Sequence, residues 1–131
     1  MNAKKIIQPQ NAPAPVGPYS HAVRAGNFLF CSGQIPLDSS KPAQVFSEMS
    51  VTAQTEQVMR NIQNILEHEH LTWANVVKTT VFMTNLADFA AMNEAYGRFI
   101  QKDAPARSTV QVTALPKGAK VEIEAVAFYE N

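Results

Sequence analysis

Three charged side chains near the C-terminus are the first candidates for chemistry: one arginine, which can bind an anion, and two glutamates. Arg107 follows Pro105 and Ala106, so its backbone is held where a strand is expected to begin. Its planar guanidinium can bind a carboxylate through two hydrogen bonds, and a surface ion pair with Asp or Glu is the alternative. Glu122 and Glu124 alternate with apolar residues and so share one strand face. A glutamate buried there would be structural or functional, whereas an exposed strand end is the alternative.

Two uncharged polar residues are further candidates. Asn93 lies four residues after Phe89 and three before Tyr96, on the apolar stripe of an expected helix. It is either a core amide bonded to backbone or a ligand contact at the edge of the stripe. Tyr19 lies on a proline-bounded loop, where most tyrosines pack their ring and leave the hydroxyl in water.

The histidines and the cysteine form no metal or nucleophile pattern. His68 and His70 are two residues apart on a helix and face different ways, and no spacing of Cys or carboxylates completes a site with His21. Cys31 is expected inside a strand, as an inert small hydrophobe. The glycines match no phosphate loop, dinucleotide fold or nucleophile elbow. We therefore expect neither a metal nor a cofactor.

The composition is that of an ordinary globular domain. The chain has 131 residues, of which 46% are hydrophobic and 17% charged, so we expect one domain over residues 1–131. Lys plus Arg and Asp plus Glu both number 11, which argues against a nucleic-acid surface that works by bulk charge. One cysteine and the lack of an apolar leader favour a reducing compartment, and we expect a cytoplasmic protein without a membrane span.

The order of expected elements is β-β-α-β-α-β-β. The prolines of segment 9–18 predict an extended loop. Apolar spacing predicts one helix, capped by Ser50 or Thr52 and ending near His70, and another over residues 88–101. Strands are predicted at 23–24, 27–32, 76–83, 108–113 and 120–129, with Gly33–Pro36 ending the second strand and a loop over 37–47. The pattern predicts an α+β sheet with both helices on one face.

The expected strands are apolar on both faces. In the last strand one face carries Val121, Ile123, Ala125 and Ala127, and the other carries Val126 and Phe128 beside the two glutamates. Strand parity likewise separates Arg107 and Thr109 from Ser108, Val110 and Val112. Two helices can cover only one face of the sheet. Another copy of the chain is the simplest cover for the other face.

Six short blocks occur in a specific order along the chain. They are Gly17-Pro18-Tyr19-Ser20, Ser32-Gly33-Gln34-Ile35-Pro36, Val77-Lys78-Thr79-Thr80-Val81-Phe82, Asn93-Glu94-Ala95-Tyr96, Pro105-Ala106-Arg107-Ser108 and Val121-Glu122-Ile123-Glu124-Ala125. Together they resemble the Rid (YjgF-type) reactive-intermediate deaminase family, in particular its RidA subgroup. The resemblance runs from about Asn11 to the C-terminus.

The resemblance implies a chorismate-mutase-like α+β fold and a homotrimer, with the three sheets facing inward and ligand sites in the clefts between subunits. It also implies the substrates, which are 2-aminoacrylate, 2-aminocrotonate and related enamine/imine intermediates. Pyridoxal-phosphate dehydratases release these intermediates from serine or threonine, and water converts them to 2-oxo acids and ammonia. The implied enzyme is a 2-iminobutanoate/2-iminopropanoate deaminase.

The resemblance also implies roles for single residues. Arg107 matches the arginine that binds the substrate carboxylate, and Glu124 matches the acid that positions or activates water. The positions that line or contact the cleft match Tyr19, Ser32, Gly33 and Asn93. RidA proteins commonly have cysteine where this chain has Thr109, whose hydroxyl can still bind substrate but cannot act as a thiol. Imine hydrolysis needs no thiol, because the imine carbon is already electrophilic.

Two other functions remain as alternatives. Some relatives are described as endoribonucleases or translation inhibitors, but the balanced charge and the lack of a basic stripe with aromatic residues weigh against RNA binding. A non-catalytic trimer that binds small carboxylates in the same clefts would need Arg107 alone. Arg107 together with Glu124 favours catalysis.

Overall fold

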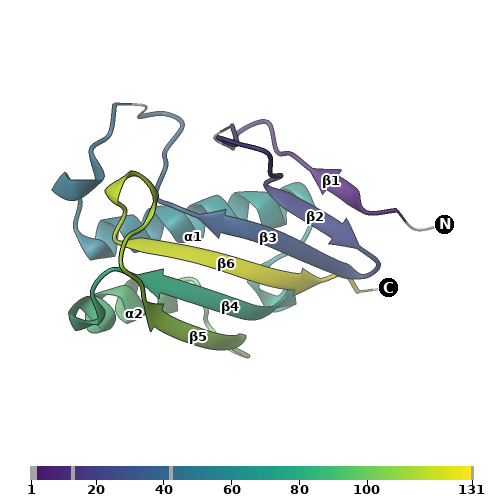
Figure 1. The fold of residues 1–131 in the computed structure, drawn as a ribbon. Helices are drawn as coiled ribbons and strands as arrows, with labels where there is room; N and C mark the ends of the chain where they lie inside the picture. Colours follow the sequence, from purple (N-terminus) through teal and green to yellow (C-terminus); the bar gives the residue numbers. More distant parts are fainter. Residues whose placement is uncertain (1–2, 13, 42, 131) are drawn as a thin grey trace.

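A six-stranded sheet organises the chain, and the computed structural model describes residues 3–12, 14–41 and 43–130. The strands are β1 (Lys5–Ile7), β2 (Ala22–Ala25), β3 (Phe28–Gln34), β4 (Val76–Met83), β5 (Ala106–Gln111) and β6 (Val121–Phe128). Their order across the sheet is β1-β2-β3-β6-β4-β5 (Figure 1). Neighbouring strands are antiparallel except β4 and β5, which are parallel. The predicted α+β fold class is confirmed.

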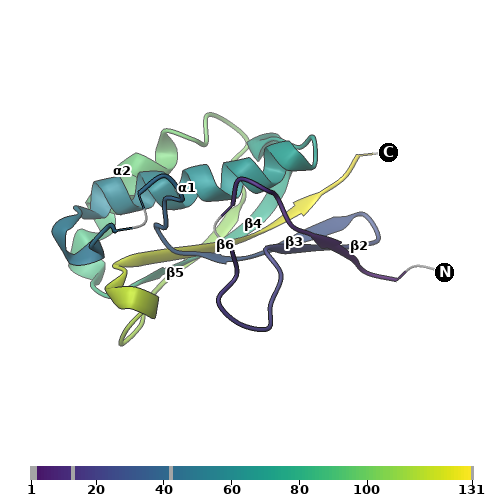
Figure 2. The same ribbon diagram turned by 90° about the horizontal axis from the view of Figure 1, so that it is seen from above.

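Two α-helices, α1 (Val51–His68) and α2 (Phe89–Gly97), lie on the same side of this sheet (Figure 2). The predicted cap of α1 is confirmed at Ser50, whose side chain accepts a hydrogen bond from the Ala53 backbone N–H at 3.0 Å. Helix α2 ends at Gly97 and not at the predicted Gln101. Its buried residues are Met92, Ala95 and Tyr96.

The core lies between the helices and the sheet. On the strands, buried and exposed residues alternate as the sequence predicts. The residues of β6 that face α1 and α2 are almost fully buried: Val121, Ile123, Ala125 and Ala127. In β4, Thr79, Val81 and Met83 are buried in the same way. The alternation of β4 fails only at its start, where a register shift between Val76 and Lys78 leaves Val77 exposed.

The opposite side of the sheet, which we call the open face, is unusually apolar for an exposed surface. Strand register places on it Phe28, Phe30, Lys78, Thr80, Phe82, Ser108, Val110, Glu122, Glu124, Val126 and Phe128. Phe28 and Phe30 are each almost half exposed, and their rings lie 6.4 Å apart. Apolar surface of this kind is typical of a protein–protein interface.

Several predicted boundaries are wrong, for identifiable reasons. Strand β1 was not predicted, because three residues are too few for a pattern; it pairs with β2. Gly33 does not end β3, since the strand passes through a bulge and Gln34 pairs with Ile123. Strand β5 begins at Ala106, so Arg107 lies inside the strand. Pro13 and Pro42, which fall in predicted loops, lie outside the described residues.

None of the helices in the described ranges combines the length and apolarity needed to cross a bilayer.

Candidate functional site

A cavity of about 640 Å³ brings together five of the residues singled out in the sequence. These five are Tyr19, Ser32, Gly33, Glu122 and Glu124. The remaining lining residues are Ala14, Val16, His21, Gln34, Ile35, Leu37, Pro116 and Lys117. The cavity therefore lies where the bulged end of β3 meets the start of β6 and the loop that precedes β2.

The bulge in β3 shapes the floor of this cavity. Ser32 is fixed there by two hydrogen bonds: its N–H donates to the His21 carbonyl at 2.9 Å, and its Oγ donates to the Ser20 carbonyl at 2.6 Å. A Cβ atom at Gly33 would overlap the carboxylate of Glu122. A side chain at position 33 would force the Glu122 carboxylate to move, so the absence of a Cβ atom lets Glu122 lie this close to the backbone. Contact of the Gly33 backbone with a ligand stays a prediction.

Of the two glutamates that line the cavity, Glu122 is the more buried. It is half-buried, whereas Glu124 is exposed. Burial raises the pKa of the Glu122 carboxyl above its ordinary value, and the negative charge of Glu124 raises it further. The resemblance assigns the water-activating role to Glu124. Strand parity places both glutamates on one face, but parity does not show which of them is desolvated.

Replacing Glu122 by glutamine should increase the free energy of unfolding at neutral pH. The pKa of the Glu122 carboxyl is higher in the folded protein than in the unfolded chain. The wild-type protein therefore loses stability as pH rises from the unfolded to the folded pKa, and it remains destabilised at higher pH. The gain should stay below about 1 kcal/mol, since solvent screens a half-exposed group. The gain in stability should disappear near pH 4. Urea unfolding at neutral pH and at pH 4, at one protein concentration, measures the gain, and exposed Glu48→Gln is the control. A Glu122→Gln protein that is less stable than wild type at neutral pH would contradict the raised pKa of Glu122.

Arg107 lies on the other side of the sheet, at its β5 edge. Register pairs it with Thr79, whose hydroxyl is hydrogen-bonded to the Tyr96 hydroxyl at 2.7 Å. The guanidinium carbon lies 4.8 Å from the centre of the Tyr96 ring and 5.6 Å from that of Phe89. Aromatic faces at these distances stabilise a cation without neutralising it. Within the described ranges no carboxylate pairs with Arg107, so the predicted alternative of a surface ion pair is not found.

Thr109 and Asn93 lie in the same region as Arg107. Thr109 points to the same side of β5, two residues along the strand, and its buried Oγ1 has no hydrogen-bond partner among the described residues. Asn93 is exposed on α2, one helical turn after Phe89, so it is not the core amide of one sequence interpretation. Contact with a ligand, the other interpretation, stays a prediction.

The predicted site residues therefore form two groups separated by the sheet. Register places Arg107 and Thr109 on the helix side, in line with Thr79 and Ala125, while Thr80 and Glu124 face the other way. Arg107 does not line the cavity that holds Glu122. Within one copy of the chain, the cavity that holds Glu122 is therefore not lined by Arg107, Thr109 or Asn93.

Two buried amides of α1 attach the cavity's loops to the helix. Asn61 donates to the carbonyls of Ile35 and Leu37, at 3.1 and 2.8 Å. Gln54 donates to the carbonyl of Phe46 at 2.9 Å and accepts from the Lys120 backbone N–H at 2.8 Å. The loop after β3 and the chain that enters β6 are thus held by one element. The roles of these two amides were not predicted from the sequence. A polar residue on the apolar stripe of a helix would have indicated them.

Within the described part of the chain, the cysteine and the histidines form no site of their own, although His21 lines the cavity that holds Glu122. Burial raises the pKa of the Cys31 thiol to about 12, which fits the predicted inert side chain. Among the residues that the structure describes, no three His, Cys, Asp or Glu side chains are placed to hold a metal ion.

Comparison with known proteins identifies close relatives. Residues 9–129 match the family model described as Endoribonuclease L-PSP. Over 127 residues the chain is 49% identical to Protein DfrA of Myxococcus xanthus, covering 95% of both chains. Reactive Intermediate Deaminase A, chloroplastic, of Arabidopsis thaliana is 44% identical over 126 residues, which are 95% of this chain and 65% of the plant protein.

The solved structures include one with a small ligand. The crystal structure of E. coli TdcF with bound serine has a TM-score of 0.87 and 40% identity, and the match covers 96% of this chain and 99% of TdcF.

Proposed function

Because the chain belongs to the Rid (YjgF-type) family, whose family model is described as Endoribonuclease L-PSP, we propose that it hydrolyses 2-imino acids to 2-oxo acids and ammonia. We assign it to the RidA subgroup, with the tautomers of 2-aminoacrylate and 2-aminocrotonate as substrates. The observation that carries the proposal concerns Glu122. Its side chain is half-buried in the cavity, its pKa is raised, and its carboxylate lies close to the backbone at Gly33, where no Cβ atom is in the way. The serine bound to TdcF supports a site for small amino acid-like carboxylates.

The proposed chemistry needs one group that can carry a proton in both directions. Water adds to the carbon of the protonated imine and loses a proton to the Glu122 carboxylate, giving a neutral carbinolamine. Glu122 then returns that proton to the amino nitrogen. The carbon–nitrogen bond breaks while the hydroxyl group loses its proton to the Glu122 carboxylate, so the 2-oxo acid forms and the ammonia leaves with that proton as ammonium. A carboxyl whose pKa is raised toward neutral pH is suited to both steps. This is why we assign the role to Glu122 and not to Glu124, the residue expected from the resemblance.

The substrate carboxylate needs a cation, and we assign it to Arg107 of a neighbouring copy. Within one copy the sheet separates Arg107 from Glu122, so a shared site between copies satisfies both roles. Tyr96 and Phe89 hold the guanidinium at the β5 edge without neutralising it. Asn93 and Thr109 would enter the same cleft with Arg107, whereas Tyr19, Ser32 and Gly33 would belong to the receiving copy. We propose the homotrimer of the family, with the open faces inward.

The open face gives this assembly its own test. Phe30→Asp places a charge among the aromatic side chains of that face and should convert the trimer to smaller species, because an unpaired buried charge is costly. Light scattering at micromolar concentration measures the mass. Val45→Asp, at a similarly exposed position on a loop, is the control and should remain trimeric. A wild-type monomer would contradict the shared site.

A coupled assay tests the function directly. A pyridoxal-phosphate threonine dehydratase releases the enamine of 2-oxobutanoate, and the chain should accelerate 2-oxobutanoate formation beyond the rate in water. RNA is offered in parallel, because the family description names an endoribonuclease. Unchanged keto acid formation would overturn the proposal, and RNA cleavage that is lost in Glu122→Gln would replace it.

A further inference from the structure

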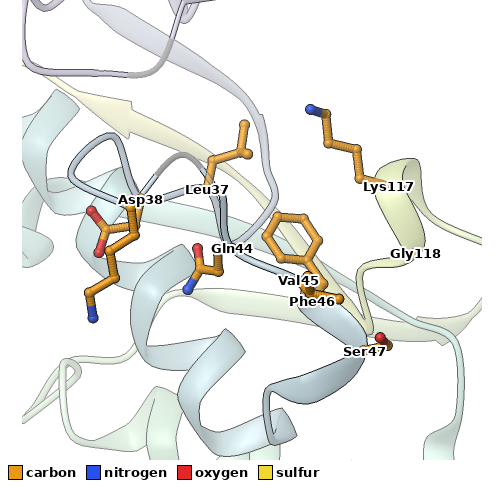
Figure 3. A pocket seen from close by; sticks show the side chains of 9 residues that line it. Leu37, Asp38, Gln44, Val45, Phe46, Ser47, Lys117 and Gly118 are labelled. Carbon is orange, nitrogen blue, oxygen red and sulfur yellow. The ribbon is translucent and has the colours of Figure 1, made fainter.

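A second cavity, of about 410 Å³, adjoins the one that holds Glu122. Leu37 and Lys117 line both cavities, so the two meet at these side chains. Figure 3 shows the second cavity between the loop that carries Leu37 and Phe46 and the turn of Lys117 and Gly118. In this view Lys117 extends from its turn toward the side of Leu37.

The walls of this second cavity are fixed. Gln54 holds both of them, since its amide donates to the Phe46 carbonyl and accepts from the N–H of Lys120, just after the Lys117 turn. The Nζ of Lys120 adds a hydrogen bond to the Met49 carbonyl at 2.9 Å. The loop and the turn are thus tied through buried groups, which gives a preformed cavity, as small-molecule sites usually are.

Lys117 is the cation that this arrangement presents to a ligand. Its backbone has a φ of 57°, the left-handed conformation, which a side chain other than that of glycine rarely adopts. No carboxylate or other acceptor among the described residues binds its ammonium group. Asp38, the acid that lines the second cavity, already accepts hydrogen bonds from the N–H and hydroxyl of Ser40, at 2.9 and 2.6 Å. The strained, left-handed backbone of Lys117 is typical of functional positions.

Apolar side chains in the same cavity suit the carbon chain of a ligand. The buried Oε1 atom of Gln44 has no hydrogen-bond partner among the described residues, but it is an acceptor and does not bind a carboxylate, so Lys117 has that role. Leu37, Val45 and Phe46 supply the apolar surface of the cavity. A short carbon chain that ends in a carboxylate matches this lining, because its methylene groups meet the apolar side chains and its oxygens reach Lys117.

We propose that the second cavity is the side-chain subsite of the imine site, and that Lys117 binds a second carboxylate there. The preferred substrate class is then the 2-imino acids with acidic side chains. The inference rests on the proposed function, in which the first carboxylate is bound by a neighbouring Arg107 and the imine carbon lies beside Glu122. Lys117 also offsets the two glutamates that would otherwise repel a dianion from the cavity.

Two 2-oxo acids of equal length test the subsite without requiring turnover. The five-carbon 2-oxopentanedioate and 2-oxopentanoate differ only in the distal carboxylate, and calorimetry gives the affinity of the wild-type protein for each. The dioate should bind at least about threefold more tightly, as expected for a solvent-exposed ion pair. Lys117→Gln should remove this preference without weakening 2-oxopentanoate binding, and Lys117→Arg should keep it. Added salt should reduce it.

The matched control is Lys4→Gln, which removes the same charge from an exposed residue that lines neither cavity and should keep the preference. Equal binding of the two acids to the wild-type protein, or equal loss of preference in both glutamine variants, would overturn the subsite and leave imine hydrolysis standing. If neither acid binds the wild-type protein, the proposed function fails and the subsite fails with it.

Discussion

Replacing Glu122 by glutamine is expected to slow imine hydrolysis about a hundredfold or more, the range typical for loss of a general acid–base group. Glutamine keeps the shape of the side chain beside Gly33 but cannot carry the proton from water to nitrogen. Affinity for 2-oxobutanoate should stay within about twofold of wild type, because the proposed ligand of the carboxylate is Arg107 and not Glu122. Hydrolysis and binding are measured on the same preparation, after light scattering has verified the assembly.

The comparison with Glu124→Gln decides between two assignments. The resemblance places water activation on Glu124, whereas burial, the raised pKa and contact with Gly33 favour Glu122. A fully active Glu122→Gln beside an inactive Glu124→Gln would return the role to Glu124. Glu48→Gln, which changes an exposed glutamate before α1, should hydrolyse at the wild-type rate and controls for the lost charge.

Replacing Arg107 by alanine is expected to weaken 2-oxo acid binding at least about tenfold, since a bidentate charge-assisted pair is lost. Hydrolysis at low imine concentration should fall by at least the same factor. Arg98→Ala is a matched control, because Arg98 is already paired with Glu56 and Glu94 on the outer surface of the helices. It should leave binding and hydrolysis unchanged.

Mixing two inactive variants tests whether the site is shared. In trimers formed at random from equal amounts of Arg107→Ala and Glu122→Gln chains, about one quarter of the sites should regain activity, since each site takes its arginine from one copy and its glutamate from the next. If both residues came from the same copy, every site would contain one defect and no activity would return. The mixed trimers are prepared by co-refolding and assayed for 2-oxobutanoate formation.

Strand parity is the most reliable predictor in this chain, because a period of two is fixed by backbone geometry. From the sequence alone it places Arg107 with Thr109, and Glu122 with Glu124. Parity cannot separate Glu122 from Glu124, since residues two apart share a face by definition. What separates them is Gly33, which reaches Glu122 only through the bulge of β3.

Features that depend on pairing across the sheet escaped prediction. Gly33 was expected to end a strand, but Gln34 continues it by pairing with Ile123, a partner far away in sequence. Helix α2 shows the same limit. Its apolar spacing included Phe89 and left Asn93 as either a core amide or a ligand contact, whereas the helix turns Met92, Ala95 and Tyr96 toward the sheet and leaves Asn93 exposed. Spacing identifies a helix more reliably than it identifies the face that packs.

The amides of Gln54 and Asn61 have a consequence for motion. They join backbone carbonyls of Ile35, Leu37 and Phe46 to a single helix, so these loop segments cannot separate from α1 without breaking these hydrogen bonds. In the language of native-state hydrogen exchange, opening of these loop segments carries the cost of breaking those hydrogen bonds, about 1–3 kcal/mol for each buried group left unpaired. We therefore expect backbone amides of these segments to exchange with solvent more slowly than those of loops without such hydrogen bonds.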